Sequence, residues 1–542
     1  MRRSASISFL RVSISLALTL LAGAAPTLSQ APKKKAAREP AGIVEFRKAV
    51  EAILADPMAQ KSFLGALIVD ADTGKPIYDL NADKFFTPAS NTKLFTTALA
   101  LAALGPDYRF HTTLETSGAL DSAGRLRGDL ILVGRGDPDF SNRQMPFDAK
   151  NPIDGPPDKP LADLADAIVA KGVKEIEGDI VADDSYLPYA PYPEGWAVGD
   201  VPFYYGAPIS AICLDDNSLD LKVTPGDHVG SPAWITVEPW PGYDVYAYSV
   251  TTGATDSPVE FDVVEEPGSK PFLLRGSIPL GHATMDEPLS MPDPTEYTAS
   301  VLKELLEARG VRITGEARAQ HAPPPAEGMT LDPPSPASSA SGAASPAVLA
   351  ERDSQPLIEI VRVINKVSQN LHAELLLRTV AKEKTGVGSL SAGLDFEKSF
   401  LKSVGVTDGD VNLDDGSGLS RENLVTPRAV VALLEYVHRQ SWGDDYFATL
   451  PVAGVDGTLD NRMKGTPAAG KIEAKTGSVE HTQAISGFAT TLHGEHLFFS
   501  IFANHYGGKG SDSTKILDAI AVAMVEDLGS PAQKPRKQQK KK

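Results

Sequence analysis

The stretch from Ser90 to Leu104 limits most strongly what this chain can fold into. Apart from Asn91, Lys93 and a few hydroxyl side chains it is apolar, so a helix here would be apolar on all sides. Such a helix cannot face water and has to lie at the centre of a domain. Gly105 and Pro106 follow directly and end it. The sequence therefore predicts a buried central helix that begins near Ser90.

The rest of the chain is long enough to surround such a helix. It has 542 residues, of which 42% are apolar and 23% charged, a composition typical of globular proteins with two or three domains. Only one N-terminal stretch is apolar enough to meet a membrane, which excludes a protein with several spans. Cys213 is the single cysteine, so an internal disulfide is impossible and stability has to come from burial.

The two ends of the chain are basic and its body is acidic. Residues 1–38 carry seven Lys or Arg and the last nine residues carry six, with no acid in either segment. Removing these 13 positive charges from the net charge of −18 leaves about −31 on residues 39–533. Such a body repels phosphate, so we expect no nucleic acid partner. The ends are expected to be solvated arms, with contact to an anionic envelope surface as the alternative.

The N-terminus has the three-part layout of a secretory signal peptide. Arginines precede the apolar run Val12–Leu21, and Ala22–Ala24 offer small residues at the cleavage positions. The run is short for a membrane span, and no cysteine follows it that could accept a lipid. We expect residues 1–25 to be removed and the mature protein to reside in the periplasm as a soluble envelope protein with no transmembrane span.

Elements at both ends of the chain predict one discontinuous α/β domain with an insert. Apolar periodicity predicts helices and strands in the following ranges: helices 43–54, 357–367, 371–382 and 513–528, and strands 64–70, 76–81, 469–475, 482–492 and 496–504. Between 110 and 321 the pattern changes to short strands, such as 127–132 and 219–223, with helices at 161–171 and 294–309. This region predicts a large mixed insert with a β-rich module nested inside it.

These patterns give the following domain boundaries: signal peptide 1–25, catalytic domain 41–107 and 348–530, insert domain 108–214 and 280–321, nested β-rich domain 215–279, linker 322–347, and basic tail 531–542. The linker is the least structured of these. Of its 26 residues, 21 are Ala, Pro, Ser or Gly, which leaves too little apolar bulk to offset the entropy of ordering it.

Ser90 and Lys93 lie three positions apart, so they share one helix face and the amine can reach the hydroxyl. Such a pair can act as nucleophile and base if burial or a second cation keeps the lysine neutral. Two other pairs, Ser300 with Lys303 and Ser399 with Lys402, have the same spacing but lie in polar helices. Only Ser90 starts a buried helix, where free N–H groups favour an oxyanion. The structural alternative is an N-cap serine beside a surface lysine.

Two further elements bear on this choice. Lys-Thr-Gly occurs twice; the copy at 384–386 is expected to be a helix end, and the copy at 475–477 ends a predicted strand. There Lys475 can present a cation, Thr476 a hydroxyl, and Gly477 a bare backbone for a substrate strand. Ser368-Gln369-Asn370 is the only Ser-x-Asn in the chain and falls between two predicted helices, where an N-cap is the structural alternative.

Together the three elements form, in this order, the motif set of penicillin-binding proteins and serine β-lactamases. The chain resembles the D-alanyl-D-alanine carboxypeptidase/endopeptidase family of low-molecular-mass class C penicillin-binding proteins over roughly residues 45–527. Further runs carry the same resemblance: 88–93, 365–371 with 373–374, 415–420, 457–459, and in the insert 136–138, 205–207 and Asn217. One departure is Gln369, since that family often has Asp at this position.

The resemblance implies an α/β fold of the serine β-lactamase and penicillin-binding transpeptidase type, with an antiparallel sheet plus helices. It implies that Ser90 attacks the bond between two D-alanines of a peptidoglycan stem peptide, with Lys93 as base and Ser368 passing a proton to the leaving amine. Asn370 would orient the substrate amide. Lys475 would hold Lys93 neutral by repulsion and receive the substrate carboxylate. The remaining substrate-binding residues are Thr476, Gly477 and Ser478, the last sharing an N–H oxyanion hole with Ser90.

The expected partners are peptidoglycan stem peptides and cross-links, with β-lactam antibiotics as covalent inhibitors. No cofactor or metal is expected, because the ten histidines show no clustered ligand spacing. A serine β-lactamase and a non-catalytic protein that binds the cell wall are the alternatives. The former would deacylate penicillin quickly, and the latter would lack reactive residues in these motifs.

Overall fold

The computed structural model describes residues 40–148, 150, 154–238, 246–265, 272–323 and 346–529. The expected signal peptide 1–25 and basic tail 531–542 lie outside the described residues, as does most of the expected linker 322–347. Within the described ranges, no helix combines the length and the apolar character that crossing a bilayer requires.

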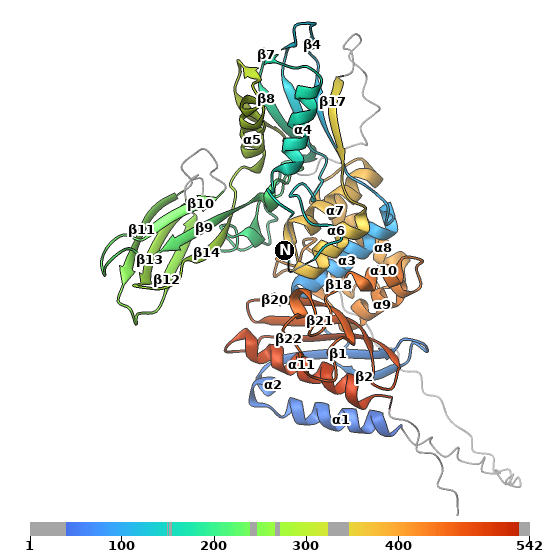
Figure 1. The fold of residues 1–542 in the computed structure, drawn as a ribbon. Helices are drawn as coiled ribbons and strands as arrows, with labels where there is room; N and C mark the ends of the chain where they lie inside the picture. The colour runs from blue at the N-terminus through green and yellow to red at the C-terminus, as the bar shows by residue number, and fades with distance from the viewer. Residues whose placement is uncertain are drawn as a thin grey trace, which may run out of the picture. The chain divides into compact units, whose positions relative to one another are not determined.

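An antiparallel sheet joins the two ends of the chain. Its strands run in the order β2-β1-β22-β21-β20, with these bounds: β1 Phe63–Asp70, β2 Pro76–Leu80, β20 Ile472–Val479, β21 Thr482–Thr490 and β22 His496–Asn504. In Figure 1 the blue N-terminal strands lie beside the red C-terminal ones. Phe63 pairs with Asn504 along the β1–β22 ladder. The predicted hairpin and the predicted three-strand unit are confirmed.

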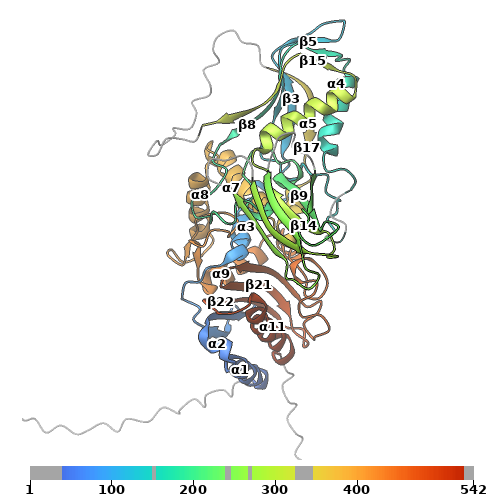
Figure 2. The same ribbon diagram turned by 90° about the vertical axis from the view of Figure 1, so that its left-hand side faces the viewer.

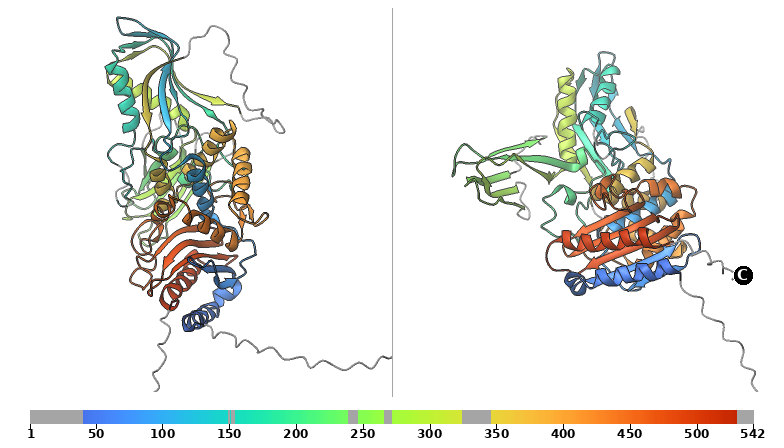
Figure 3. Two further views of the ribbon diagram at one scale, coloured as in Figure 1. Left: turned by 90° about the vertical axis from the view of Figure 1, so that its right-hand side faces the viewer. Right: turned by 60° about the horizontal axis from the view of Figure 1, so that its bottom comes forward.

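Helices cover both faces of this sheet. Helices α1 (Ala41–Leu54) and α11 (Gly510–Asp527) pack together on one face (Figure 3, right), where Phe46 and Ile520 join a buried apolar cluster. Helix α9 (Pro427–His438) contacts the other face. Phe86 stacks on Phe502 in the cluster on that side. Burying each such side chain contributes about 2 kcal/mol to folding.

Helix α3 (Thr92–Leu104) is the buried central helix that the sequence predicts. Every residue from Thr92 to Leu101 is buried. Helix α3 contacts α6, α7, α8 and α9, and Figure 2 shows it beside α7 and α8. The remaining helices of this part have the following bounds: α2 Pro57–Lys61, α6 Leu357–Val367, α7 Asn370–Thr385, α8 Leu390–Ser403 and α10 Gly443–Ala448, with β18 Val411–Asn412 and β19 Leu424–Val425 as a short ladder.

The insert contains a mixed sheet with strand order β16-β8-β6-β3-β17 and a second sheet with order β15-β7-β5-β4. The bounds are β3 His111–Thr116, β4 Ala119–Leu120, β5 Arg125–Arg127, β6 Leu130–Val133, α4 Lys159–Ala170, β7 Glu175–Ile176, β8 Ile180–Pro188, α5 Pro294–Ala308, β15 Arg312–Ile313, β16 Ala317–Ala322 and β17 Ala347–Asp353. The predicted single strand 127–132 is wrong. Gly128, at φ 142°, turns the chain from one sheet into the other.

The insert begins and ends on neighbouring strands. His111, the first residue of β3, pairs with Asp353, the last residue of β17, although they are 242 positions apart. The Phe110 N–H donates a hydrogen bond of 2.9 Å to Ser354 Oγ just outside this pair. The chain therefore enters and leaves the insert at one place.

The nested module is built from two small sheets with orders β10-β9-β14 and β11-β13-β12. Their bounds are β9 Ser218–Thr224, β10 Trp234–Glu238, β11 Tyr246–Gly253, β12 Glu260–Glu265, β13 Phe272–Pro279 and β14 Met285–Ser290. Strand β14 pairs with β9 although it lies beyond the expected boundary at 279, and β17 pairs with β3 although the catalytic segment was expected from 348. The division into domains stays a prediction.

Candidate active site

Ser90 lies in a 3-10 turn, η1 (Ala89–Asn91), immediately before α3. The preceding residue, Ala89, has a φ of 48°, a left-handed conformation that costs a non-glycine residue about 1 kcal/mol. Two glycines allow neighbouring segments to close on this turn. A Cβ at Gly477 would lie 2.5 Å from the Pro88 carbonyl oxygen, and one at Gly418 would lie 1.9 Å from the Ala89 carbonyl oxygen. Both segments therefore hold the serine turn by direct backbone contact.

Lys93 has the contacts that a base for Ser90 needs. Its Nζ lies 2.9 Å from Ser90 Oγ and donates hydrogen bonds of 2.6 Å to Asn370 Oδ1 and to the Ser417 carbonyl oxygen. The side chain is fully buried. A neutral amine has two N–H donors and one lone pair. The two acceptors use the donors, which leaves the lone pair for the Ser90 hydroxyl.

The second and third motifs meet at the same place. Lys475 is fully buried, and its Nζ donates hydrogen bonds of 2.9 Å to Ser368 Oγ and to the Thr476 carbonyl oxygen. Asn91, next to Ser90, donates from Nδ2 to the Lys475 carbonyl oxygen at 3.1 Å. The three predicted elements, far apart in sequence, therefore meet through direct hydrogen bonds around Lys93 and Lys475.

The Ser-x-Asn element forms a tight turn between α6 and α7. Ser368 ends α6 with a φ of 64°, in the left-handed region. The Gln369 side chain caps α7 by accepting a hydrogen bond from the Leu371 N–H. The N-cap that we considered as the structural role of this element is therefore Gln369. Asn370 Nδ2 donates to the Tyr205 carbonyl oxygen of the insert at 2.8 Å. The insert thus supports this motif directly.

The predicted strand that carries Lys-Thr-Gly extends further than expected. We predicted its end at Lys475, but β20 continues to Val479 because its pairing with β21 continues to Thr482. Thr476 Oγ1 lies 2.7 Å from Thr458 Oγ1, and Ser478 Oγ accepts a hydrogen bond of 2.7 Å from Gln483 Nε2. These side chains line the cleft.

An open cleft of about 880 Å³ lies over Ser90. It brings together residues from the serine turn, the insert, the loop after β18, and β20. Its lining includes Ser90, Arg143, Asp200, Tyr205, Asp216, Ser368, Gln369, Asn370, Gly418, Arg421, Thr458, Thr476 and Ser478. Among these, Arg421 and Asp200 form an ion pair of 2.7 Å.

Burial dominates the electrostatics of the two lysines. It lowers the pKa of Lys93 to about 7, against the raising effect of the Asp415 and Glu374 carboxylates. Burial, and after it the charge of Lys93, lower the pKa of Lys475 well below its ordinary value. We expected repulsion by Lys475 to keep Lys93 neutral, but burial is the main cause.

The repeated motifs lie apart from this site. Ser300 and Ser399 each donate to a backbone carbonyl of their own helix, while Lys303 donates to the Gly315 carbonyl oxygen and Lys402 pairs with Asp408. The Lys-Thr-Gly at 384–386 ends α7, with Gly386 as the left-handed cap at φ 82°. These elements have the structural roles that the sequence predicts.

Sequence reasoning missed the groups that hold the motifs in place. The Asp415 carboxylate accepts hydrogen bonds from the Gly418 and Ser420 N–H groups and from Trp196 Nε1, which fixes the loop whose Ser417 carbonyl meets Lys93. The run 415–420 was noticed only as part of the resemblance. Its spacing gives no signal that a backbone carbonyl is the functional atom.

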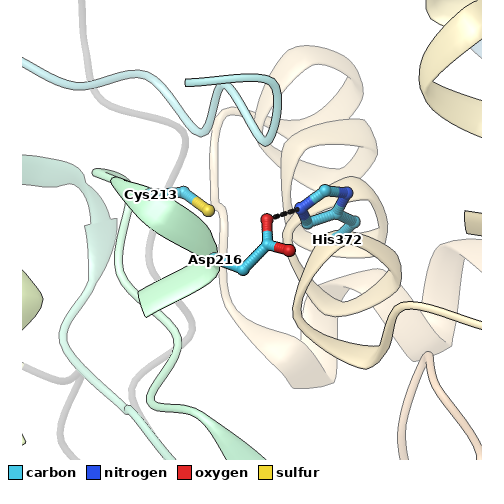
Figure 4. A group of neighbouring side chains, drawn as sticks. All are labelled: Cys213, Asp216 and His372. Carbon is cyan, nitrogen blue, oxygen red and sulfur yellow. Dashed lines mark hydrogen bonds and ion pairs between the residues drawn. The ribbon is translucent and has the colours of Figure 1, made fainter. Parts of the chain in front are cut away.

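Cys213, Asp216 and His372 have side chains of the types that bind metals, and their ligand atoms lie within 4.8 Å of one another (Figure 4). Their separation in sequence explains why ligand spacing did not reveal the group. His372 Nε2 already lies 2.9 Å from Asp216 Oδ1, and Arg143 forms an ion pair with the same carboxylate. A metal ion would have to replace these contacts, so the donor set fits a hydrogen-bonded ion pair better than a metal centre.

Comparisons with known proteins agree with this arrangement. Residues 46–526 match the D-Ala-D-Ala carboxypeptidase 3 (S13) family. The chain is 33% identical to a D-alanyl-D-alanine carboxypeptidase of an Actinomadura species, over 98% of this chain and 92% of that protein. It is 27% identical to the D-alanyl-D-alanine carboxypeptidase DacB of Haemophilus influenzae, over 84% of this chain and 88% of that protein.

The fold is also similar to that of a solved structure. The crystal structure of penicillin binding protein 4 from Haemophilus influenzae has a TM-score of 0.74 and 25% identity, and the match covers 88% of this chain and 98% of that one. The expected fold class is therefore confirmed. The chain belongs to the D-Ala-D-Ala carboxypeptidase 3 (S13) family and is a serine-type D-Ala-D-Ala carboxypeptidase.

Proposed function

We propose that Ser90 Oγ attacks the carbonyl carbon between the two D-alanines of a peptidoglycan stem peptide. The carbon–nitrogen bond breaks, the terminal D-alanine leaves, and an ester remains on Ser90. Water then attacks this ester and releases the shortened peptide. The observation that carries this assignment is the 2.9 Å approach of Lys93 Nζ to Ser90 Oγ in a buried site.

Lys93 is the base of this scheme. With a pKa of about 7, a substantial fraction of Lys93 is neutral at physiological pH and can take the Ser90 proton. Asn370 Oδ1 and the Ser417 carbonyl oxygen fix the direction of the amine. Proton transfer to a base held in this way typically accelerates a reaction by about 10² to 10⁴.

Ser368 is the proposed proton donor to the leaving amine. Its Oγ lies 2.9 Å from Lys475 Nζ, so the proton that Ser368 gives to the leaving nitrogen can be replaced from Lys475 when a bound substrate carboxylate keeps that amine protonated. Asn370 orients the substrate amide at the same turn. The N–H groups of Ser90 and Ser478 are the proposed oxyanion hole, in which loss of one donor typically costs about 3 kcal/mol of transition-state stabilisation.

Hydroxyl groups that line the cleft bind the substrate carboxylate in this scheme, and Lys475 is the buried cation near them. Thr476, Thr458 and Ser478 line the cleft, while Lys475 is fully buried. A carboxylate bound to these hydroxyls favours the protonated form of Lys475, because opposite charges in a buried site attract strongly. Gly477 keeps β20 close to the serine turn, and its proposed contact with a substrate strand stays a prediction.

Replacing Lys475 by alanine should harm substrates with a free carboxylate most. We expect kcat/KM for a D-alanyl-D-alanine peptide to fall about 100-fold, and by about 10-fold for the same peptide with its C-terminus amidated, since that peptide does not need the cation. The two values are measured by D-alanine or D-alaninamide release. Equal losses on both peptides would contradict the carboxylate role. Lys464→Ala, which changes a lysine outside the cleft lining, is the control.

We infer that the chain acts on peptidoglycan stem peptides and cross-links, that β-lactams acylate Ser90, and that the mature protein resides in the periplasm. A related structure of the Haemophilus influenzae protein holds a β-lactam, with a TM-score of 0.69 and 25% identity, which supports the inhibitor class. Export rests on the signal-like residues 1–25. Detection of the mature chain in a periplasmic extract tests it.

Incubation with a stem pentapeptide and with a cross-linked muropeptide tests the activity itself. We expect release of one D-alanine from the pentapeptide, read by mass spectrometry. Cleavage of the cross-link would establish endopeptidase action, for which the cleft of about 880 Å³ offers more room than a terminal dipeptide occupies. Neither product forming would overturn the proposal. A long-lived penicilloyl adduct would separate the protein from a β-lactamase, which releases penicillin quickly.

A further inference from the structure

The insert reaches the Ser-x-Asn turn through the carboxylate of Asp216. This residue belongs to η3 (Asp215–Asn217) in the insert. Asp216 Oδ2 accepts a hydrogen bond of 3.0 Å from Gln369 Nε2 and pairs with Arg143, while Asp216 Oδ1 lies 2.9 Å from His372 Nε2 (Figure 4). Gln369 and His372 flank Asn370 in sequence. One carboxylate of the insert thus contacts residues before and after Asn370 in the Ser-x-Asn turn.

The backbone around Asp216 is strained in a way that only a supported segment tolerates. Asp215, Asp216 and Asn217 all have φ values near 52°, three left-handed residues in succession without a glycine. Each costs about 1 kcal/mol or more. The buried Asn217 repays part of this by donating from Nδ2 to the Pro208 carbonyl oxygen at 3.0 Å. The strained turn is what presents the Asp216 carboxylate to Gln369.

Gln369 is engaged at both ends of its amide. Its Oε1 accepts from the Leu371 N–H at 3.2 Å and its Nε2 donates to Asp216 at 3.0 Å. In the opposite orientation the Gln369 NH₂ would face the Leu371 N–H and its oxygen would face the Asp216 carboxylate. These contacts fix the direction of the amide. A carboxylate at position 369 could still cap the helix, but its other oxygen would face Asp216. Gln369 and Asp216 are therefore matched in charge.

We propose that Asp216 is a positioning residue for the acylation reaction, acting through Gln369 and His372 on the turn that carries Ser368 and Asn370. The insert is then part of the catalytic apparatus, and the residue at 369 is dictated by the acid opposite it. This inference rests on the proposed function, because it concerns the same Ser368 and Asn370.

The test is a charge-exchange cycle at the two positions. Gln369→Glu keeps the size and the helix cap but sets a second carboxylate 3.0 Å from Asp216. We expect it to lower the second-order rate of acylation by a fluorescent penicillin about tenfold or more. Adding Asp216→Asn restores a donor opposite position 369 and leaves one negative charge for Arg143. The double variant is expected to regain most of the lost rate.

Gln320→Glu is the matched control. Gln320 Nε2 donates to Asp183 Oδ2 at 2.7 Å, the same pair of groups in an exposed part of the insert, and its replacement should leave the rate within twofold of wild type. Melting temperatures of all variants show whether they fold. Should Gln369→Glu alone fail to fold, a folded and active double variant supports the proposal, and a folded but inactive one overturns it.

Two results would refute the positioning role: an unchanged rate for Gln369→Glu, or a double variant no faster than Gln369→Glu. Rescue by the second substitution is the decisive readout, since a merely structural loss at 369 would not be restored by removing a charge at 216. Labelling of a Ser90→Ala variant is measured in parallel. Persistent labelling there would refute the proposed function, whereas its loss together with an unchanged Gln369→Glu rate would refute only this inference.

Discussion

Replacing Ser90 by alanine is expected to abolish covalent labelling by a fluorescent penicillin and to reduce D-alanine release at least 10⁴-fold. Without the hydroxyl no ester can form, and what remains is the modest catalysis that binding and an oxyanion hole give to water. Ser90 is partly buried, and the N-cap position of α3 is Asn91 rather than Ser90, so the variant should keep the melting temperature of the wild type.

The chain supplies its own controls for this experiment. Ser300 and Ser399 have the same spacing to a lysine, but each donates to a backbone carbonyl of its own helix. Ser300→Ala and Ser399→Ala should label at the wild-type rate. Labelling of Ser90→Ala at full stoichiometry would show that a different serine is the nucleophile.

Replacing Lys93 by methionine is expected to slow acylation about 10³-fold, because the side chain keeps its length but loses the base. The same group sets the pH dependence of the wild type. Burial lowers the pKa of Lys93 to about 7, and only the neutral amine accepts a proton. The rate constant kcat/KM should therefore rise with pH through about 7 and level off above it.

The charge of Lys93 also lowers the pKa of Lys475, so the two neighbouring amines titrate as a coupled pair. In Lys93→Met the residual rate should no longer rise through pH 7. Lys303→Met, at a lysine that donates to the Gly315 carbonyl oxygen far from the cleft, should keep both rate and profile. A wild-type profile that stays flat from pH 5 to pH 9 would contradict the role of Lys93 as base.

The sequence was sufficient to predict the buried helix that begins beside Ser90 and carries Lys93, whose reactive roles stay a proposal. Ser90 and Lys93 were separated from two identical spacings by the apolar helix that follows them, and burial of α3 from Thr92 to Leu101 confirms that reasoning. The reason is physical, because a helix that is apolar on all sides has to lie in the core of the domain. The position of its first turn is then fixed as well.

The supporting atoms could not be predicted in the same way. The Ser417 and Tyr205 carbonyl oxygens are backbone atoms, which carry no residue-type signal. Asp216 meets Gln369 across 153 positions through a strained turn that no local propensity favours. Local pattern also failed at Gly128, where one apparent strand belongs to two sheets.

The adjacent entry and exit of the insert have a consequence for how the chain folds. Closing a flexible loop becomes more costly with its length, and β1 and β22 pair across more than 420 positions. Once β3 and β17 have paired, however, His111 and Asp353 are neighbours. The inserted residues between them then add little to the loop length that has to be closed. Early folding of the insert would thus shorten the effective loop between β1 and β22 and speed their pairing.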